Sequence, residues 1–319
     1  MSVIRQTVSN VSLTTGAGLD EVFDSAYEID KQPGVVRADD PLFFRQDETE
    51  FLVVQYAESM GPGQFRATAE DEEVDEATVR VANRTTAEVF EFDRDIAIPE
   101  RYQESSASYG TVERWVFELG VRARTSQDEQ AFRRSYADAF GGVDTPDGAD
   151  LVSNSHTALS GDTVDNLETG ALSADNLFTV VRSLRLQRAQ DGSLGSCHAD
   201  GLLVPSNLHA TATVITDSDL KPGTGNNDIN YISKVYPGLV VGCSEWLDST
   251  YNTYNTNANT SYFVVSRMHM ITRAVRVPIK RGHISPEYDR KRRAFYRARF
   301  SERVYAGSWV GVVGSNGTV

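Results

Sequence analysis

The sequence predicts a folded α+β protein. Segments with the two-residue alternation of strands are mixed with segments of helical periodicity, and the two kinds do not alternate strictly along the chain. The chain has 319 residues, of which 40% are hydrophobic, so it can bury a sizeable core in one or two domains. No stretch approaches the roughly 20 apolar residues that a membrane span needs, and the N-terminus has no apolar signal core. We therefore expect no membrane partner.

The N-terminal part of the chain is expected to be an irregular, extended arm. Gly16, Gly18, Pro33 and Gly34 interrupt any regular period up to about residue 41. Residues 50–56 and 78–92 then show the apolar runs and the alternation that are typical of strands. Together these two segments predict a hairpin with a protruding tip.

The tip of this hairpin is strongly acidic. Its acids are Glu70, Asp71, Glu72, Glu73, Asp75 and Glu76. Residues 51–100 as a whole contain 12 acids against four arginines, which gives a net charge of -8. The alternative interpretation of the tip is a solvated loop that only keeps the protein soluble.

Helical periodicity begins after the hairpin. Apolar residues at three- and four-residue steps predict a long amphipathic helix over residues 112–140, which Gly141 and Gly142 would end. Ser173 is expected to cap a second helix, because its hydroxyl can accept a hydrogen bond from a free backbone N–H of the first turn. The apolar face of that helix consists of Leu177, Val180, Val181 and Leu184.

Short buried strands are expected in the second half of the chain. Apolar runs predict them at residues 202–204, 239–243, 262–270 and 274–279. Pro205 follows the first of these strands, and its fixed φ and missing N–H suit the first turn of a helix. That helix would carry Leu208, Ala212 and Ile215 on one face.

The sequence contains no motif of enzyme chemistry, metal binding or nucleotide binding. It has no glycine-rich phosphate loop and no Gly-x-Ser-x-Gly frame. Cys197, His198, His209 and Cys243 lack the spacing of a zinc site, and the aspartates between residues 147 and 165 lack the register of a calcium loop. The two cysteines are interpreted as buried thiols that suit a reducing compartment. We therefore expect no catalytic residue, no metal and no cofactor.

Charge is distributed very unevenly along the chain. The net charge is -14, which argues against free-standing nucleic-acid binding. Residues 261–319, however, contain 12 Lys and Arg against three acids, a net charge of +9. The chain thus has an acidic body and a basic C-terminal segment.

Two stretches of the chain resemble the major capsid proteins of tailed bacteriophages. The first is TPDGADLVSNSH (residues 145–156), in which Asp147, Gly148, Leu151 and His156 are similar to a DG..LF...H stretch of that family. The second runs from LLVPSNL (residues 202–208) to the closing WVGVVGS (residues 309–315). Each motif is weak alone, but their order is specific, and the resemblance covers nearly the whole chain.

The resemblance implies the Hong Kong-97 fold, which has five parts in sequence order. They are an N-terminal arm (residues 1–47), an extended β-hairpin loop (48–100), a spine helix with part of the peripheral domain (101–144), a mainly axial domain (145–280) and a C-terminal return into the peripheral domain (281–319).

The implied function is that of a structural major capsid (head) protein, not an enzyme. It would self-assemble through hexamers and pentamers into an icosahedral shell enclosing phage double-stranded DNA, which it would contact non-specifically. Expected partners are a separate scaffolding protein, a portal protein and a decoration protein. The expected location is the virion capsid, after synthesis in the host bacterial cytoplasm.

Two other functions are consistent with parts of the sequence. An encapsulin-type nanocompartment shell protein would have the same fold, with a protein cargo in place of DNA. The Asn-, Thr- and Tyr-rich run at residues 251–260 would suit an extracellular adhesive or carbohydrate-binding module, but the favoured interpretation is a mobile surface loop of the axial domain.

The resemblance also concerns how subunits hold together. Some family members crosslink through a lysine of the extended loop that attacks an asparagine of a neighbouring subunit. Asn316 could be such an acceptor, but this chain has no lysine between Lys31 and Lys221. A non-covalent shell is therefore expected. The family geometry would place the acidic tip against a neighbour's basic cluster of Arg290, Lys291, Arg292 and Arg293. The competing interpretation is that this cluster faces packaged DNA.

Overall fold

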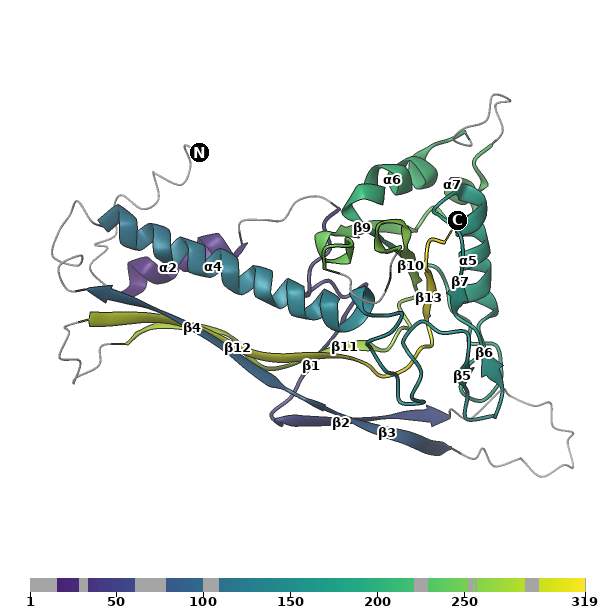
Figure 1. Ribbon diagram of the computed structural model, residues 1–319, viewed down its shortest axis with the longest axis horizontal. Coiled ribbons are helices and arrows are strands. Elements are labelled where there is room, and N and C mark those ends of the chain that lie inside the picture. Colours follow the sequence, from purple (N-terminus) through teal and green to yellow (C-terminus); the bar gives the residue numbers. More distant parts are fainter. Residues whose placement is uncertain are drawn as a thin grey trace, which may run out of the picture.

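A four-stranded sheet that contains the three longest strands runs along the molecule (Figure 1). The computed structural model describes residues 16–28, 34–60, 79–99, 109–220, 229–251, 255, 257–284 and 293–318. The strand order is β1 (Arg45–Glu48), β11 (Ile271–Ile284), β12 (Arg293–Ala306) and β4 (Phe90–Pro99). β1 pairs parallel to β11, whereas the β11–β12 and β12–β4 pairs are antiparallel. The strand predicted at residues 274–279 is thus the middle of a 14-residue strand.

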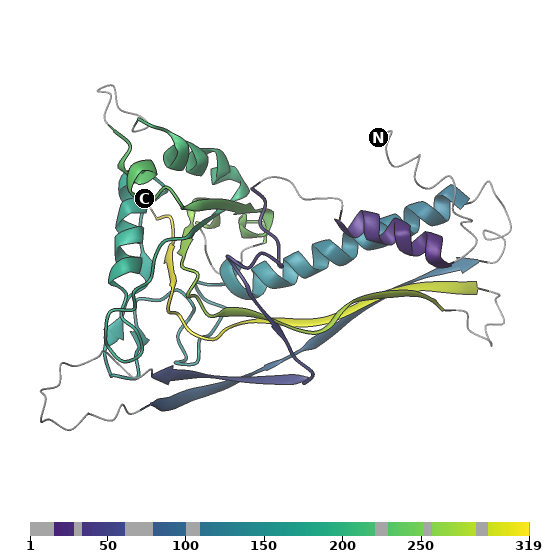
Figure 2. The same ribbon diagram turned by 180° about the vertical axis from the view of Figure 1, so that it is seen from behind.

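A long helix, α4 (Tyr109–Phe132), lies along one face of this sheet (Figures 1 and 2). It is the helix predicted for residues 112–140, but its regular part ends earlier. A π-helical turn, η2 (Arg133–Ala137), follows it. Ser135 gives a physical reason, since its hydroxyl donates to the carbonyl of Ala131 at 2.6 Å and so competes with the backbone ladder.

A second helix, α2 (Gly16–Glu28), lies beside α4. Its apolar face, which includes Leu19, Val22 and Phe23, is buried against α4 and the sheet. The two helices approach closely at Gly120, where a Cβ would lie 2.6 Å from the carbonyl oxygen of Phe23. The prediction of an irregular arm is therefore wrong over residues 16–28. The glycines at the start of this segment begin the helix instead of interrupting it.

The other end of the molecule contains a five-stranded sheet. Its order is β7 (Leu167–Glu168), β13 (Val312–Ser315), β10 (Tyr262–Val265), β8 (Gly201–Pro205) and β9 (Val240–Ser244). β13 pairs parallel to β7, and β8 parallel to β9; β10 pairs antiparallel to β13 and β8. Every residue of β8, β10 and β13 is buried, in agreement with the apolar runs that predicted strands near residues 202 and 262.

Three helices share a hydrophobic core with this second sheet. They are α5 (Ala174–Leu186), α6 (His209–Asp217) and α7 (Tyr231–Val235). The predicted cap of α5 is confirmed, because Ser173 Oγ accepts from the backbone N–H of Asn176 at 3.2 Å. The predicted apolar face of α5 is buried as well. Pro205, by contrast, ends β8, and a 3-10 turn, η3 (Ser206–Leu208), precedes α6.

A two-stranded hairpin, β2 (Val53–Met60) and β3 (Arg80–Glu88), lies on the side of the four-stranded sheet opposite α4 (Figures 1 and 2). It confirms the predicted pairing of the two strand-like segments, although the second segment continues into β4. A smaller hairpin pairs β5 (His156–Thr157) with β6 (Thr163–Val164). Two further 3-10 turns are η4 (Glu245–Leu247) and η5 (Ala258–Thr260).

One hydrophobic core joins the two large sheets at the C-terminal end of α4. Phe43, Phe44, Phe132, Tyr136 and Phe263 are all buried there. The phenol of Tyr136 donates to the carbonyl of Phe43 at 2.9 Å. Of the helices in the described part of the chain, none combines the length and the apolar character that a membrane crossing requires.

Candidate assembly surfaces

The β2–β3 hairpin has one face against the body and one open face. Residues paired across the hairpin share a face, so Tyr56 and Glu58 with their partners point one way, and the pairs that include Val53 and Val81 point the other. Tyr56 stacks on Tyr305 of β12, with ring centroids 4.2 Å apart. Val53 and Val81 are 52% and 54% exposed. The hairpin thus carries apolar side chains that its own chain does not cover.

A bulge in β3 lies opposite the buried end of this inner face. Ala57 pairs with Arg84 and Glu58 with Ala82, so Asn83 is the extra residue of the bulge. Its φ of 51° is left-handed, a conformation that Asn tolerates better than most residues. Its side-chain amide donates to Glu58 Oε2 at 3.0 Å. The bulge therefore directs an amide at the Glu58 carboxyl, which is only 2% exposed.

The aspartate and histidine of the DG..L....H stretch form a buried pair that faces Glu58. Asp147 Oδ2 is 2.9 Å from His156 Nδ1 and accepts from the backbone N–H of Thr157 at 3.1 Å. The His156 ring stacks on Trp309, with centroids 5.2 Å apart. Burial raises the pKa of Asp147, but hydrogen bonds from His156 and Thr145 lower it by more, to about 2. The predicted motif is thus a buried support for the end of the β2–β3 strands nearest the hairpin tip.

Most of the residues predicted to form inter-subunit contacts lie outside the described part of the chain. This holds for Glu70, Asp71, Glu72, Glu73, Asp75, Glu76, Arg290, Lys291 and Arg292. Arg293 begins β12, where its backbone is in register with Pro99 of β4. Of the run at residues 251–260, the described residues are 251, 255 and 257–260.

Some of the acid–base complementarity between the hairpin region and the C-terminal segment is satisfied inside one chain. Glu91 Oε1 lies 3.4 Å from Arg299 Nη1, and Asp95 Oδ2 lies 3.5 Å from Arg297 Nη2. The antiparallel pairing of β4 with β12 creates both contacts. These four residues belong to the oppositely charged segments found in the sequence, so only the remaining charges are available for a neighbouring subunit.

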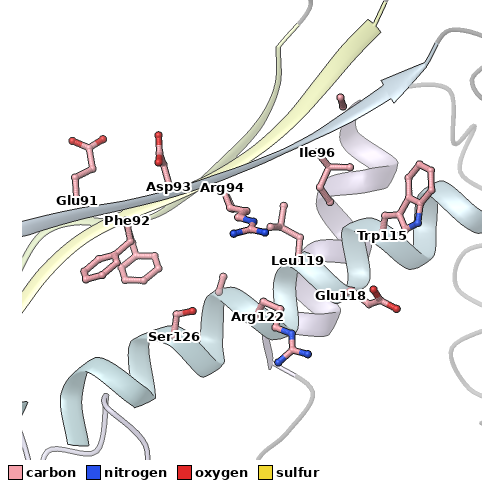
Figure 3. A pocket seen from close by; sticks show the side chains of 14 residues that line it. Glu91, Phe92, Asp93, Arg94, Ile96, Trp115, Glu118, Leu119, Arg122 and Ser126 are labelled. Atoms are coloured by element: carbon pink, nitrogen blue, oxygen red, sulfur yellow. The ribbon is translucent and has the colours of Figure 1, made fainter. Parts of the chain in front are cut away.

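An open groove of about 870 Å³ lies between α4 and β4 (Figure 3). Phe92 and Ile96 of β4 line it together with Trp115 and Leu119 of α4. Phe92 stacks on Phe300 of β12 at 5.0 Å. Figure 3 shows Phe92 and Arg94 on the helix side of β4, whereas Glu91 and Asp93 point away from it. Trp115 thus borders an open groove that combines apolar and charged side chains.

The cysteines and the candidate metal ligands show no arrangement for chemistry. Cys197 and Cys243 are buried and free, and burial raises the pKa of the Cys197 thiol to about 11. A thiol with such a pKa is a poor nucleophile. Among the described residues, no group of three or more His, Cys, Asp or Glu side chains could hold a metal ion.

The sequence did not single out Glu58 or Asn83, and Trp309 entered only as the first residue of the closing WVGVVGS motif. One feature of the sequence could have pointed to Glu58. Strand alternation places Glu58 on the same face of β2 as Tyr56, and the aromatic ring of Tyr56 indicates the face that packs against the rest of the subunit. The bulge at Asn83 and the distant partners of Glu58 left no periodic signal.

Comparisons with known proteins agree on the fold. No family model and no curated protein matches the sequence. Among solved structures, the chain is similar to a virus-like particle from Pyrococcus furiosus, with a TM-score of 0.53 and 10% identity, over 93% of this chain and 97% of that one. It is also similar to the capsid of a native gene transfer agent particle (TM-score 0.52, 15% identity, 91% and 95% covered).

A third similar structure is the capsid of the cyanophage P-SCSP1u. Its TM-score is 0.51 at 11% identity, and the match covers 90% of each chain. The three similarities extend over almost the full length of both partners in each case. The chain therefore has the Hong Kong-97 fold of capsid proteins, as the resemblance in its sequence predicted.

Proposed function

We propose that this chain is the major capsid (head) protein of a tailed bacteriophage. It self-assembles through hexamers and pentamers into an icosahedral shell around double-stranded DNA and resides in the virion after synthesis in the host cytoplasm. The observation that carries this proposal is the whole-chain similarity to a virus-like particle, a gene transfer agent capsid and a cyanophage capsid. The five-part division into arm, extended loop, spine helix, axial domain and C-terminal return is part of the proposal.

The surfaces of the subunit support assembly through contacts between unlike patches. The outer face of the hairpin, with exposed Val53 and Val81, and the groove between α4 and β4, with Trp115 and Leu119, both combine apolar side chains with charged ones and lie on different elements. When a patch on one subunit binds a different patch on the next, every contact repeats the same rotation. A closed ring forms if these rotations add up to a full turn. We assign the hairpin of one subunit to its neighbour's four-stranded sheet region, without a covalent link.

Electron microscopy of the purified protein, with and without its scaffolding protein, tests the proposal. Closed particles or capsomers are the expected result, and boiled particles should run as a single band near 35.2 kDa. A stable, monodisperse monomer under all assembly conditions would contradict the capsid function. A ladder of crosslinked bands would contradict only the non-covalent contact.

The acidic tip of the hairpin and the basic cluster give the assembly contact a proposed electrostatic part. Exposed pairs contribute only about 0.2–1 kcal/mol each, but they recur at every contact in a shell. Replacing Glu70, Asp71, Glu72 and Glu73 with their amides should make assembly of empty shells slower and less dependent on salt. If empty-shell assembly is unchanged while Arg292→Glu with Arg293→Glu impairs only DNA-filled particles, the cluster binds DNA instead.

The similarity to a virus-like particle supports a second candidate, an encapsulin-type compartment that encloses protein. Particles purified from the native source distinguish the two. Nuclease-protected double-stranded DNA, together with portal, scaffolding or decoration proteins, supports the phage capsid. Particles that contain one abundant protein cargo and no DNA support the compartment.

A further inference from the structure

The end of the β2–β3 strands nearest the hairpin tip contains a buried carboxyl group with no Lys or Arg paired to it among the described residues. Glu58 is the one acid on the inner face of β2, and its side chain enters the body where the hairpin meets residues 145–157. Among the described residues it makes no ion pair with Lys or Arg, and its hydrogen bond comes from the neutral amide of Asn83. Burial of an ionised carboxylate without a cation is costly. The stability of the contact between the hairpin and the body therefore depends on whether Glu58 is charged.

Three polar atoms in this region have no hydrogen-bond partner among the described residues. They are Glu58 Oε1, His156 Nε2 and Trp309 Nε1. Asp147 occupies the other ring nitrogen of His156, and Gln190 connects the same region to Ser308 through a 3.5 Å contact. The protein therefore surrounds the Glu58 carboxyl with polar groups but supplies no fixed positive charge in contact with it.

We propose that Glu58 is a positioning residue that holds the hairpin at a fixed angle to the body while its carboxyl carries a proton, and releases the hairpin when the proton is lost. The docked hairpin is anchored at two points on its inner face, Glu58 and the Tyr56–Tyr305 stack. Loss of the first anchor leaves the second as a pivot. The partner that receives the hairpin is a second copy of this chain, and this part rests on the proposed function.

The groups that face Glu58 set the direction of the pH response. Burial raises its pKa, the Asn83 amide lowers it, Asp147 raises it, and Gln190 and His156 lower it; the net shift is upward from 4.5. Two further charges lie near Tyr56, two residues away on the same face: Arg303 lowers the pKa of Tyr56 and Asp144 raises it. A raised pKa means that the docked hairpin binds the proton more tightly than the released one. Docking is therefore strongest in acid and weakens as the pH rises from 4.5 to the pKa of the docked state.

Hydrogen–deuterium exchange of unassembled, full-length subunits between pH 5 and 8.5 tests this inference. Protection is expressed relative to the intrinsic exchange rate at each pH, for the amides of β2 and β3. In the wild-type chain it should fall with rising pH, by at most about tenfold per pH unit. Glu58→Gln keeps the group neutral, so its protection should stay constant. Glu88→Gln, a change of an exposed acid in the same hairpin, should behave like wild type.

Two internal controls make the result decisive. Protection of β8 and β10 reports whether the body of each variant is folded. Asn83→Gly removes one amide donor to the carboxylate and tolerates the left-handed φ of this position, so it should increase the loss of protection at pH 8.5 even if Glu58→Gln does not fold. The inference is overturned if Glu58→Gln keeps the wild-type pH profile, or if wild-type protection does not change with pH. Because the subunits are unassembled, neither outcome depends on shell formation.

Discussion

Two antiparallel strand pairs of this molecule, β11–β12 in the body and β2–β3 in the hairpin, differ in how much of their surface the chain itself satisfies. The β11–β12 pair has β1 and β4 on its edges and α4 on one face. Its buried acid, Glu302, accepts a hydrogen bond from Arg273 Nε at 2.9 Å. Among the described residues, the β2–β3 pair has no further strand on either edge, an open face with exposed valines, and a buried acid without a Lys or Arg partner.

The difference suggests that the two pairs serve different purposes. A buried ion pair with its hydrogen bonds in place fixes one geometry, because loss of either partner leaves an isolated charge. A hairpin with free edges and an exposed apolar face is incomplete as a monomer and is completed by another chain. On this view, stability resides in the body and assembly depends on the hairpin.

The largest expected effect comes from breaking the ion pair of the body. Arg273→Ala leaves Glu302 buried and unpaired and removes a 3.3 Å hydrogen bond to Gln46. We expect the free energy of unfolding to fall by about 3–5 kcal/mol, measured by urea denaturation. The matched control is Arg114→Ala, in an exposed pair with Glu118, which should cost no more than about 0.5 kcal/mol. Equal losses in both variants would show that the sheet pair is not a fixed structural element.

An intermediate effect is expected at the buried pair that supports the tip-side end of the hairpin strands, where Asp147 has a pKa of about 2. A lowered pKa means that the ionised form stabilises the fold above the ordinary value of 3.8, and that this contribution is lost as the pH falls through 2. It amounts to about 2 kcal/mol. Denaturation curves between pH 2.5 and 7 should show Asp147→Asn less stable than wild type at pH 7, with the difference shrinking in acid. A difference that is independent of pH would rule out this linkage.

The smallest effect on stability, with a large effect on assembly, is expected on the outer face of the hairpin. Val53→Ser with Val81→Ser removes two exposed side chains, so subunit stability should change by less than about 0.5 kcal/mol. Each valine is already about half buried, so burying the rest against a neighbour is worth roughly half of the about 1.5–3 kcal/mol for full burial, and loss of both should raise the concentration needed for assembly at least about tenfold. Light scattering measures it, with Gln55→Ser as the control on the same face. Unchanged assembly would mean that this face is not a contact.

Local patterns predicted much of the fold because they depend on neighbours in sequence. The cap at Ser173, the buried face of α5 and the apolar strands at residues 202–204 and 262–265 are examples. α2 was missed because its first turn contains two glycines, although Leu19, Val22, Phe23 and Ala26 have helical spacing.

The candidate site was less predictable, since its contacts join residues far apart in sequence. Glu58 meets Asp147, His156 and Gln190 only after the hairpin folds back on the body. The pairing of Glu91 with Arg299 likewise depends on the register of β4 with β12, which no periodicity reveals. Charge along the sequence therefore could not show that Glu91 and Asp95 meet Arg299 and Arg297 within one chain, and the predicted contact between the acidic tip and Arg290, Lys291, Arg292 and Arg293 stays a prediction.

The most direct test of the account is a cryo-electron microscopy structure of assembled particles at a resolution that shows side chains. The account predicts closed icosahedral shells in which the outer face of β2 and β3, with Val53 and Val81, lies against the four-stranded sheet region of a neighbouring subunit. The body of each subunit should keep its two sheets and the Arg273–Glu302 pair. Shells in which the hairpin contacts only its own chain, or the absence of any closed assembly, would contradict it.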